Sequence, residues 1–99
     1  MAIGPFTAIA APYNVKQALN ISASTVIKAS RGFVATVNVL TAGSAPGEVH
    51  DCATTGAASA ANKVATIPNT VGTYTLNFPC LTGITYVLGT GQVISVSYQ

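Results

Sequence analysis

Hydrophobic residues recur at every second position along most of the chain. In the segment from 72 to 78, GTYTLNF, the apolar Tyr74, Leu76 and Phe78 alternate with threonine and asparagine. A period of two is typical of a β-strand that turns one face to a core and the other to solvent. Threonine and valine dominate such segments, and their branched side chains fit a pleated sheet. The pattern therefore predicts an all-β protein.

The same alternation predicts further strands and their buried faces. The expected buried faces are Phe33, Ala35, Val37 and Val39 in one long strand, with Thr36 and Asn38 opposite; Ile84, Tyr86 and Leu88 in a second; and Ile94, Val96 and Tyr98 in the last. Shorter strands are expected over Leu19–Ser22, Thr25–Ala29, Glu48–Cys52 and Val64–Ile67.

Glycine, proline and asparagine separate these strands at short intervals. The expected turns are Ser30–Gly32, Gly43–Gly47, Pro68–Thr70, Leu81–Gly83 and Gly89–Gly91, the last as a tight hairpin between Leu88 and Val93. Many short strands with such turns predict a small β-sandwich or a jelly-roll-like barrel. The pattern does not distinguish a jelly-roll from an immunoglobulin-like strand order.

Two segments lack the alternation. Residues 1–17 contain Pro5 and Pro12 and are expected to form a short N-terminal arm, which leaves 18–99 as a single β-sandwich domain. The run Cys52–Lys63, CATTGAASAANK, consists almost entirely of small residues. We expect it to be a loop or a single helical turn that packs closely against a neighbouring surface.

Composition narrows the class of protein. Of 99 residues, 49% are hydrophobic and only 6% are charged, with a formal net charge of +2, whereas about a quarter of an ordinary soluble domain is charged. Such a chain is too sparsely charged to bind nucleic acid and too aliphatic to be disordered. No apolar run approaches the roughly 18 residues of a membrane span. The first residues also lack the basic segment of a signal peptide, so synthesis in a cytoplasm is expected.

Titratable side chains cluster only at Glu48, His50, Asp51 and Cys52. On a strand, Glu48, His50 and Cys52 share one face, which makes a Cys/His catalytic couple conceivable. The alternative is that His50 is a polar residue at the surface. Two carboxylates are too few for a calcium loop, and no second Cys/His pair completes a zinc site. We expect no catalytic residue, cofactor or metal.

The remaining polar and aromatic candidates favour packing over chemistry. Cys52 and Cys80 either form a disulfide or remain two buried thiols, and GTGQ at 89–92 lacks the third glycine of a dinucleotide-binding loop. A sugar-binding face would use tyrosines, but these are scattered through the sequence at Tyr13, Tyr74, Tyr86 and Tyr98. The cations that could contact an acidic partner are scattered as well, at Lys16, Lys28 and Arg31.

The shortage of charge points to assembly. A domain of this size buries only about 60 to 65% of its unfolded surface, so part of so apolar a chain stays outside. Permanent interfaces between subunits are depleted in charge and rich in apolar residues. We therefore expect a homo-oligomer that docks on a larger structure, with the arm and Cys52–Lys63 as candidate contact surfaces.

A series of turn motifs carries a resemblance. A hydrophobic strand runs into GSAPG at 43–47 and is followed by Asp51; IPNTVG at 67–72, a P-x-x-T-G element at 79–83 and GTGQ before a closing strand come next. With these motifs, the stretch from Ser24 to Tyr98 resembles small structural proteins from the virion gene clusters of tailed bacteriophages.

The resemblance implies a capsid decoration, or cement, protein. Such a protein sits on the outside of the capsid, bridges neighbouring major capsid protein subunits and forms a trimer. The resemblance offers no catalytic residue to carry over. Tail or head-fibre modules share this kind of small β domain, so the alternative is a fibre module that binds bacterial surface glycan through tyrosines.

Overall fold

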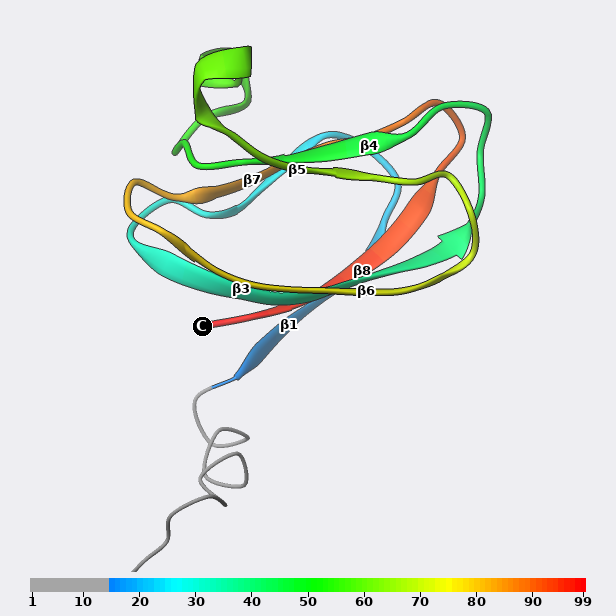
Figure 1. Ribbon diagram of the computed structural model, residues 1–99, viewed down its shortest axis with the longest axis horizontal. Helices are drawn as coiled ribbons and strands as arrows, with labels where there is room; N and C mark the ends of the chain where they lie inside the picture. Colours follow the sequence, from blue (N-terminus) through cyan, green and yellow to red (C-terminus); the bar gives the residue numbers. More distant parts are fainter. Residues whose placement is uncertain (1–14) are drawn as a thin grey trace, which may run out of the picture.

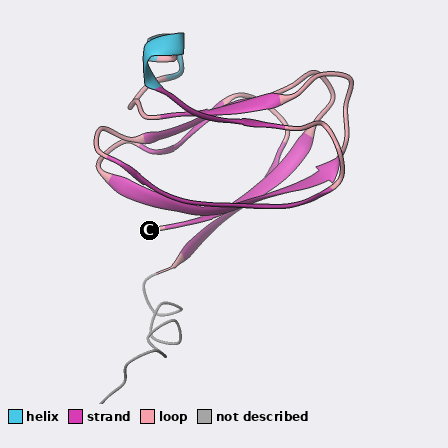
Figure 2. Cartoon of the chain, viewed as in Figure 1, coloured by secondary structure: helices cyan, strands magenta, loops and turns pink. Residues whose placement is uncertain are grey.

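The computed structural model describes residues 15–99, which form eight strands and two short 3₁₀ turns (Figures 1 and 2). The strands are β1 (Lys16–Ile21), β2 (Thr25–Lys28), β3 (Gly32–Thr41), β4 (Gly47–His50), β5 (Lys63–Ile67), β6 (Gly72–Cys80), β7 (Ile84–Val87) and β8 (Val93–Tyr98). The turns η3 (Thr55–Ala57) and η4 (Ala60–Asn62) lie between β4 and β5. The expected all-β fold is confirmed.

Two four-stranded antiparallel sheets pack face to face, with strand orders β1-β8-β3-β6 and β2-β7-β4-β5. The pairing is nested: β1 pairs with β8, β2 with β7, β3 with β6, and β4 with β5. One long double ribbon, closed at the β4–β5 end, therefore wraps into both layers. This strand order is that of a jelly roll, a choice that the sequence pattern leaves open.

The core lies between the sheets and consists of β-branched valines and isoleucines, one cysteine and one large aromatic. Its fully buried members are Val34, Val37, Val39, Val49, Ile67, Cys80, Ile84, Tyr86, Ile94 and Val96. The faces expected for the strands that became β7 and β8 agree with this core, because Ile84, Tyr86, Ile94 and Val96 are at most 2% exposed. Each such side chain contributes roughly 1.5 to 3 kcal/mol by burial.

In β3, the expected buried face is wrong at its first half. Val34 is buried, whereas Phe33 and Ala35 are only partly buried. The pairing of β3 with both β6 and β8 shifts register between Val34 and Thr36. The extra residue of this β-bulge reverses the alternation, so the predicted face holds only for Val37 and Val39.

Phe78 is also misassigned, because its side chain is 46% exposed. Tyr74 and Leu76, by contrast, pack against the core as expected. Asn77, between Leu76 and Phe78, has a φ of 48°. This left-handed conformation, which asparagine tolerates better than most residues, interrupts the strict alternation of a strand.

The turn at Gly89–Gly91 does not close a hairpin, because β7 and β8 belong to different sheets. It crosses between the layers and packs against the Gly43–Gly47 turn, where a Cβ on Gly89 would collide with the backbone carbonyl of Ala45. Beside it, the Gln92 side-chain carbonyl accepts bonds from the Tyr86 hydroxyl (2.9 Å) and the Gly89 N–H (3.2 Å). These contacts fix one end of the sandwich.

The expectation of an arm over 1–17 falls mostly outside the described residues. Within the described part, Lys16 and Gln17 already belong to β1, where they pair with Tyr98 and Ser97 of β8. The small-residue run Cys52–Lys63 is a loop with single helical turns, as expected. Among residues 15–99, no helix is long and apolar enough to cross a membrane.

Candidate functional site

The titratable cluster lies on the outer face of the β2-β7-β4-β5 sheet. In β4, Val49 points into the core, while Glu48 and His50 point outward on either side of it in the sequence. Residues 52–62, here called the covering loop, fold back over this face (Figure 1). We call the surface formed by Glu48, His50, Thr85 and Val87 the covered face.

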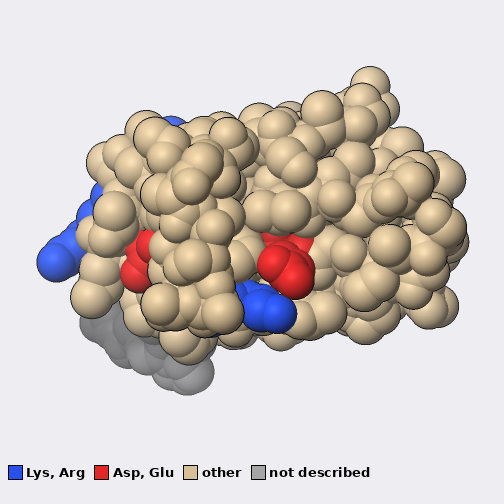
Figure 3. All heavy atoms as spheres, turned by 90° about the horizontal axis from the view of Figure 1, so that it is seen from above, with Lys and Arg blue, Asp and Glu red and all other residues tan. Residues whose placement is uncertain are grey.

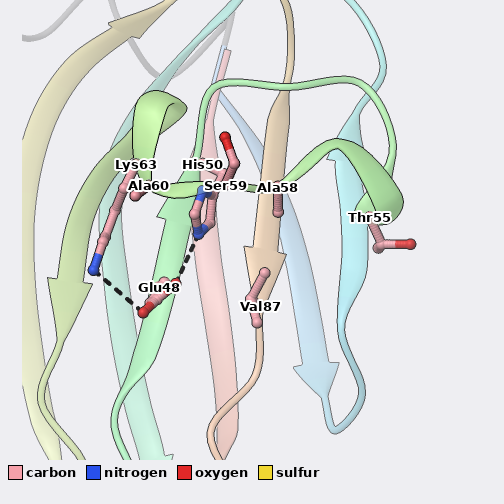
Figure 4. Close-up of a pocket in the computed structure, with 8 residues that line it drawn as sticks. All are labelled: Glu48, His50, Thr55, Ala58, Ser59, Ala60, Lys63 and Val87. Atoms are coloured by element: carbon pink, nitrogen blue, oxygen red, sulfur yellow. Dashed lines mark hydrogen bonds and ion pairs between the residues drawn. The ribbon is translucent and has the colours of Figure 1, made fainter.

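His50 is only 3% exposed, although it lies outside the hydrophobic core. The interpretation of His50 as a surface residue is therefore wrong: the covering loop buries it. Its Nε2 lies 2.8 Å from Glu48 Oε1 (Figure 4). Its Nδ1 lies 2.8 Å from Asn62 Oδ1. Both ring nitrogens are thus occupied inside the protein.

Asn62 connects His50 to the covering loop. Its Oδ1 also accepts the backbone N–H of Ser59 at 3.0 Å, and its Nδ2 donates to the Ala57 carbonyl at 2.9 Å. The Ser59 side-chain oxygen accepts the backbone N–H of Asn62, which completes a capping box at the start of η4. One side chain therefore organises both 3₁₀ turns and fastens them to β4.

Glu48 lies between two cations or potential cations. Its Oε1 faces His50, and its Oε2 accepts from Lys63 Nζ at 3.3 Å. The hydrogen bonds from His50 and Lys63 hold the pKa of the Glu48 carboxyl below its ordinary value. Beside these three side chains lies an open pocket of about 350 Å³ whose loop wall includes Thr55, Ser59 and small alanines (Figure 4).

Asp51 points away from His50 and fastens a different segment. Its carboxylate accepts the backbone N–H groups of Leu81 (3.1 Å), Thr82 (2.8 Å) and Gly83 (3.2 Å), in the link from β6 to β7. Burial alone would raise the pKa of Asp51, but these three bonds outweigh it and lower the pKa. Asp51 and Glu48 thus have separate partners, and their carboxylates do not converge on a common site.

Cys52 and Cys80 are both free and buried. Cys52 Sγ donates to the Thr54 carbonyl at 3.3 Å, so it does not pair with His50. Burial, together with the nearby Asp51 charge and Cys52, raises the pKa of Cys80 to about 11. A thiol held in its protonated form is a poor nucleophile. Within residues 15–99, no group of three His, Cys, Asp or Glu side chains is placed to hold a metal ion.

The opposite surface, the outer face of the β1-β8-β3-β6 sheet, has a different chemistry. Hydroxyls and amides form a ladder across three strands: Thr36 Oγ1 lies 2.6 Å from Ser97 Oγ, Asn38 Nδ2 donates to Ser95 Oγ at 3.2 Å, and Thr73 Oγ1 donates to Asn38 Oδ1 at 2.7 Å. We call this surface the hydroxyl face. No described segment lies across it (Figure 1).

The hydroxyl face is almost free of charge. Lys16, at the start of β1, is the only charged residue in the four strands of its sheet. Leu19 in β1 and Leu40 in β3 are 61% and 54% exposed. Even the other side of the molecule shows only a few charged groups on an otherwise uncharged surface (Figure 3). This sheet therefore presents neutral hydrogen-bonding groups beside exposed aliphatic side chains.

The remaining candidates are dispersed. Tyr86 is buried, and Tyr74 bonds the Thr70 carbonyl at 2.6 Å and packs on the core with Tyr98; Tyr13 lies outside the described residues. The structure thus places none of the three described tyrosines in a shared exposed row. Lys28 and Arg31 line a second open pocket near Phe33 and Leu81, away from Lys16.

Sequence reasoning selected Glu48 and His50 but missed Asn62, which holds the site together. Ser59 and Asn62 lie three residues apart in a run of small residues. This spacing is typical of a capping box and could have pointed to Asn62. Comparisons of the chain with protein-family models, with curated proteins and with solved structures found no match.

Proposed function

We propose that this chain is a structural protein of a tailed-bacteriophage virion, a non-catalytic cement protein that decorates the capsid exterior as a homotrimer and bridges major capsid protein subunits. The observation that carries the proposal is the hydroxyl face: a four-stranded sheet with one charged residue and exposed Leu19 and Leu40. Such an uncharged surface with exposed aliphatic side chains suits a permanent protein contact, because such contacts are depleted in charge.

Three further features support the proposal. The stretch from Ser24 to Tyr98 resembles phage virion proteins, and eight-stranded jelly rolls occur among viral capsid domains. Both ring nitrogens of His50 are occupied by Glu48 and Asn62, so this residue is not free to act as a general base. Cys52 and Cys80 are at most 3% exposed. A passive, contact-forming role needs none of these groups to react.

The deciding experiment is the location and copy number of the chain in virions from the phage that encodes it. A cement protein is expected at hundreds of copies per particle, as threefold density on the head in cryo-electron microscopy, and at the mass of three chains in solution. A few copies on the tail or fibres would instead support the glycan-binding alternative. Absence from the particle would overturn both.

The contact surface is tested separately with a matched pair of variants. Leu40→Lys places a charge on the hydroxyl face, where Leu40 is 54% exposed, and Thr66→Lys places one at an exposed position of β5, on the outer face of the other sheet. We expect Leu40→Lys to lose binding to capsids that lack the chain, and Thr66→Lys to bind as the unmodified chain does. Equal binding by both variants would remove the hydroxyl face as the contact while leaving the location experiment intact.

A further inference from the structure

The orientation of the Asn62 amide is fixed by its own neighbours. Its oxygen faces the Ser59 N–H and its nitrogen faces the Ala57 carbonyl, at 3.0 and 2.9 Å. Reversing the amide would set two donors against each other at Ser59 and two acceptors at Ala57. The atom that lies 2.8 Å from His50 Nδ1 is therefore an oxygen, which can only accept, so Nδ1 carries a proton.

The other ring nitrogen faces a second acceptor. Nε2 lies 2.8 Å from Glu48 Oε1, and the second oxygen of the same carboxyl accepts from Lys63 Nζ. The Glu48 carboxyl is ionised at neutral pH, since its pKa lies below the ordinary value of 4.5. An ionised carboxylate has no proton to give. Nε2 therefore carries a proton as well.

We infer that His50 is held as an imidazolium cation with both ring nitrogens protonated, and that it fastens the covering loop to β4, so that removal of one proton releases the loop. This inference is independent of the proposed function. A neutral imidazole has one donor and one lone pair, so it can satisfy Glu48 or Asn62 but not both. The unsatisfied contact sets a lone pair against an oxygen.

The surroundings of His50 favour the cation. Glu48 of β4 supplies the only negative charge in contact with the ring. Lys63 lies opposite His50 in the β4–β5 pairing, and its Nζ donates to the other Glu48 oxygen. From β7, the covered face contributes the uncharged Thr85 and Val87, and the pocket wall from the loop is equally uncharged. Asp51, the next residue, directs its carboxylate to the β6–β7 link. A buried cation with one carboxylate partner is compensated.

The sign of the pH response follows from this network. The fastening is complete while His50 carries both protons, and it is lost as the pH rises and one proton leaves. The loop then loses either its bond to β4 through Asn62 or the Glu48 contact that holds the ring. The core on the other side of β4 contains no such group, so the opening is confined to the covering loop.

His50 is the only histidine in the chain, so its ring can be observed without assignment ambiguity. We would label histidine with ¹⁵N, record long-range ¹H–¹⁵N spectra across a pH series, and measure amide exchange in the covering loop and in β3. We expect both nitrogens to be protonated at pH 7, and loop exchange, corrected for intrinsic rates, to rise roughly ten- to a hundredfold when one proton is lost. Exchange in β3 should not follow.

Three variants separate the cation from a merely structural role. Glu48→Gln removes the charge and should leave one ring nitrogen bare at pH 7, while the control Lys63→Met keeps the Nε2 contact and should leave both protonated. His50→Gln should make loop protection independent of pH. A bare nitrogen at pH 7 in the unmodified chain overturns the inferred cation. Loss of a proton without faster loop exchange overturns the fastening.

Discussion

The two outer faces of this sandwich use polar side chains in opposite ways. On the covered face, the chain concentrates Glu48, His50 and Lys63 and buries the His50 ring under its own loop, while the Glu48 and Lys63 side chains stay 36% exposed. On the hydroxyl face, neutral hydroxyls and amides bond one another across strands, and no described segment covers them. The charged side chains of the covered face therefore connect segments of the same chain to one another. The side chains of the exposed hydroxyl face are almost all uncharged.

The comparison explains where the scarce charge goes. The chain has two acidic residues, and both have internal partners: Glu48 holds His50 and Lys63, and Asp51 holds the β6–β7 link. Neither acid is therefore available for an external partner without breaking a contact that supports the fold. The surface therefore offers a partner even fewer free negative charges than the composition suggests.

The largest effect is expected from breaking the covered face at its centre. His50→Ala leaves Glu48 and Asn62 without their shared partner and opens a hole under the covering loop. Removing one member of a buried charged contact costs about 3 kcal/mol. Urea unfolding at pH 7 measures the loss in free energy of unfolding. A loss below about 1 kcal/mol would show that the covering loop is not fastened through this ring.

A somewhat smaller effect is expected at Asp51, which fastens the link between the two sheets. Asp51→Ala orphans three backbone N–H groups and should lower the free energy of unfolding by about 2 kcal/mol, since hydrogen bonds to a charged group are stronger than neutral ones. Asp51→Asn, which keeps one oxygen for Thr82 and Gly83, should lose clearly less. Equal losses in the two variants would contradict the role of these bonds.

Acid should weaken both fastenings together. Glu48 and Asp51 have folded-state pKa values below the ordinary 4.5 and 3.8. The stability that they contribute is therefore fully present above about pH 4.5 and is lost as the pH falls through the folded values. Unfolding midpoints at pH 7 and pH 3 measure the change. The double variant Glu48→Gln, Asp51→Asn should show a flatter response, and an unchanged pH dependence would argue against these two groups.

The smallest effect on stability is expected on the hydroxyl face. Thr36→Ala breaks the 2.6 Å contact with Ser97 Oγ, but water can replace the lost partner at a surface that nothing described covers. We expect a loss of about 0.5 kcal/mol in the free energy of unfolding, within the range of a neutral hydrogen bond. A loss as large as that of His50→Ala would erase the contrast between the two faces.

Local pattern predicted local structure well. Alternation located the strands and assigned Ile84, Tyr86, Ile94 and Val96 to the core, because side-chain direction in a strand depends only on position parity. It failed at Phe33 and Phe78, where a bulge and the left-handed Asn77 change that parity without changing the residue types. Neither irregularity has a signature as strong as a glycine-rich turn.

Long-range features could not be predicted in the same way. The burial of His50 depends on a loop that returns over β4, and its two partners come from β4 itself and from η4. The strand order likewise depends on pairing between segments at opposite ends of the chain. The pattern of a single sequence indicates which residues prefer a buried face. It does not indicate which distant segment will cover that face.

Because β1 pairs with β8, the first of the described strands pairs with the last of them. Among the described strands, only β4 and β5 are neighbours in the sequence that also pair, so most pairings join segments far apart in the chain, and such non-local contacts slow folding. During translation, β1 and β3 lack β8 until Tyr98 has been made. Partly folded states in which β8 is not yet in place therefore expose unpaired strand edges, which favour aggregation.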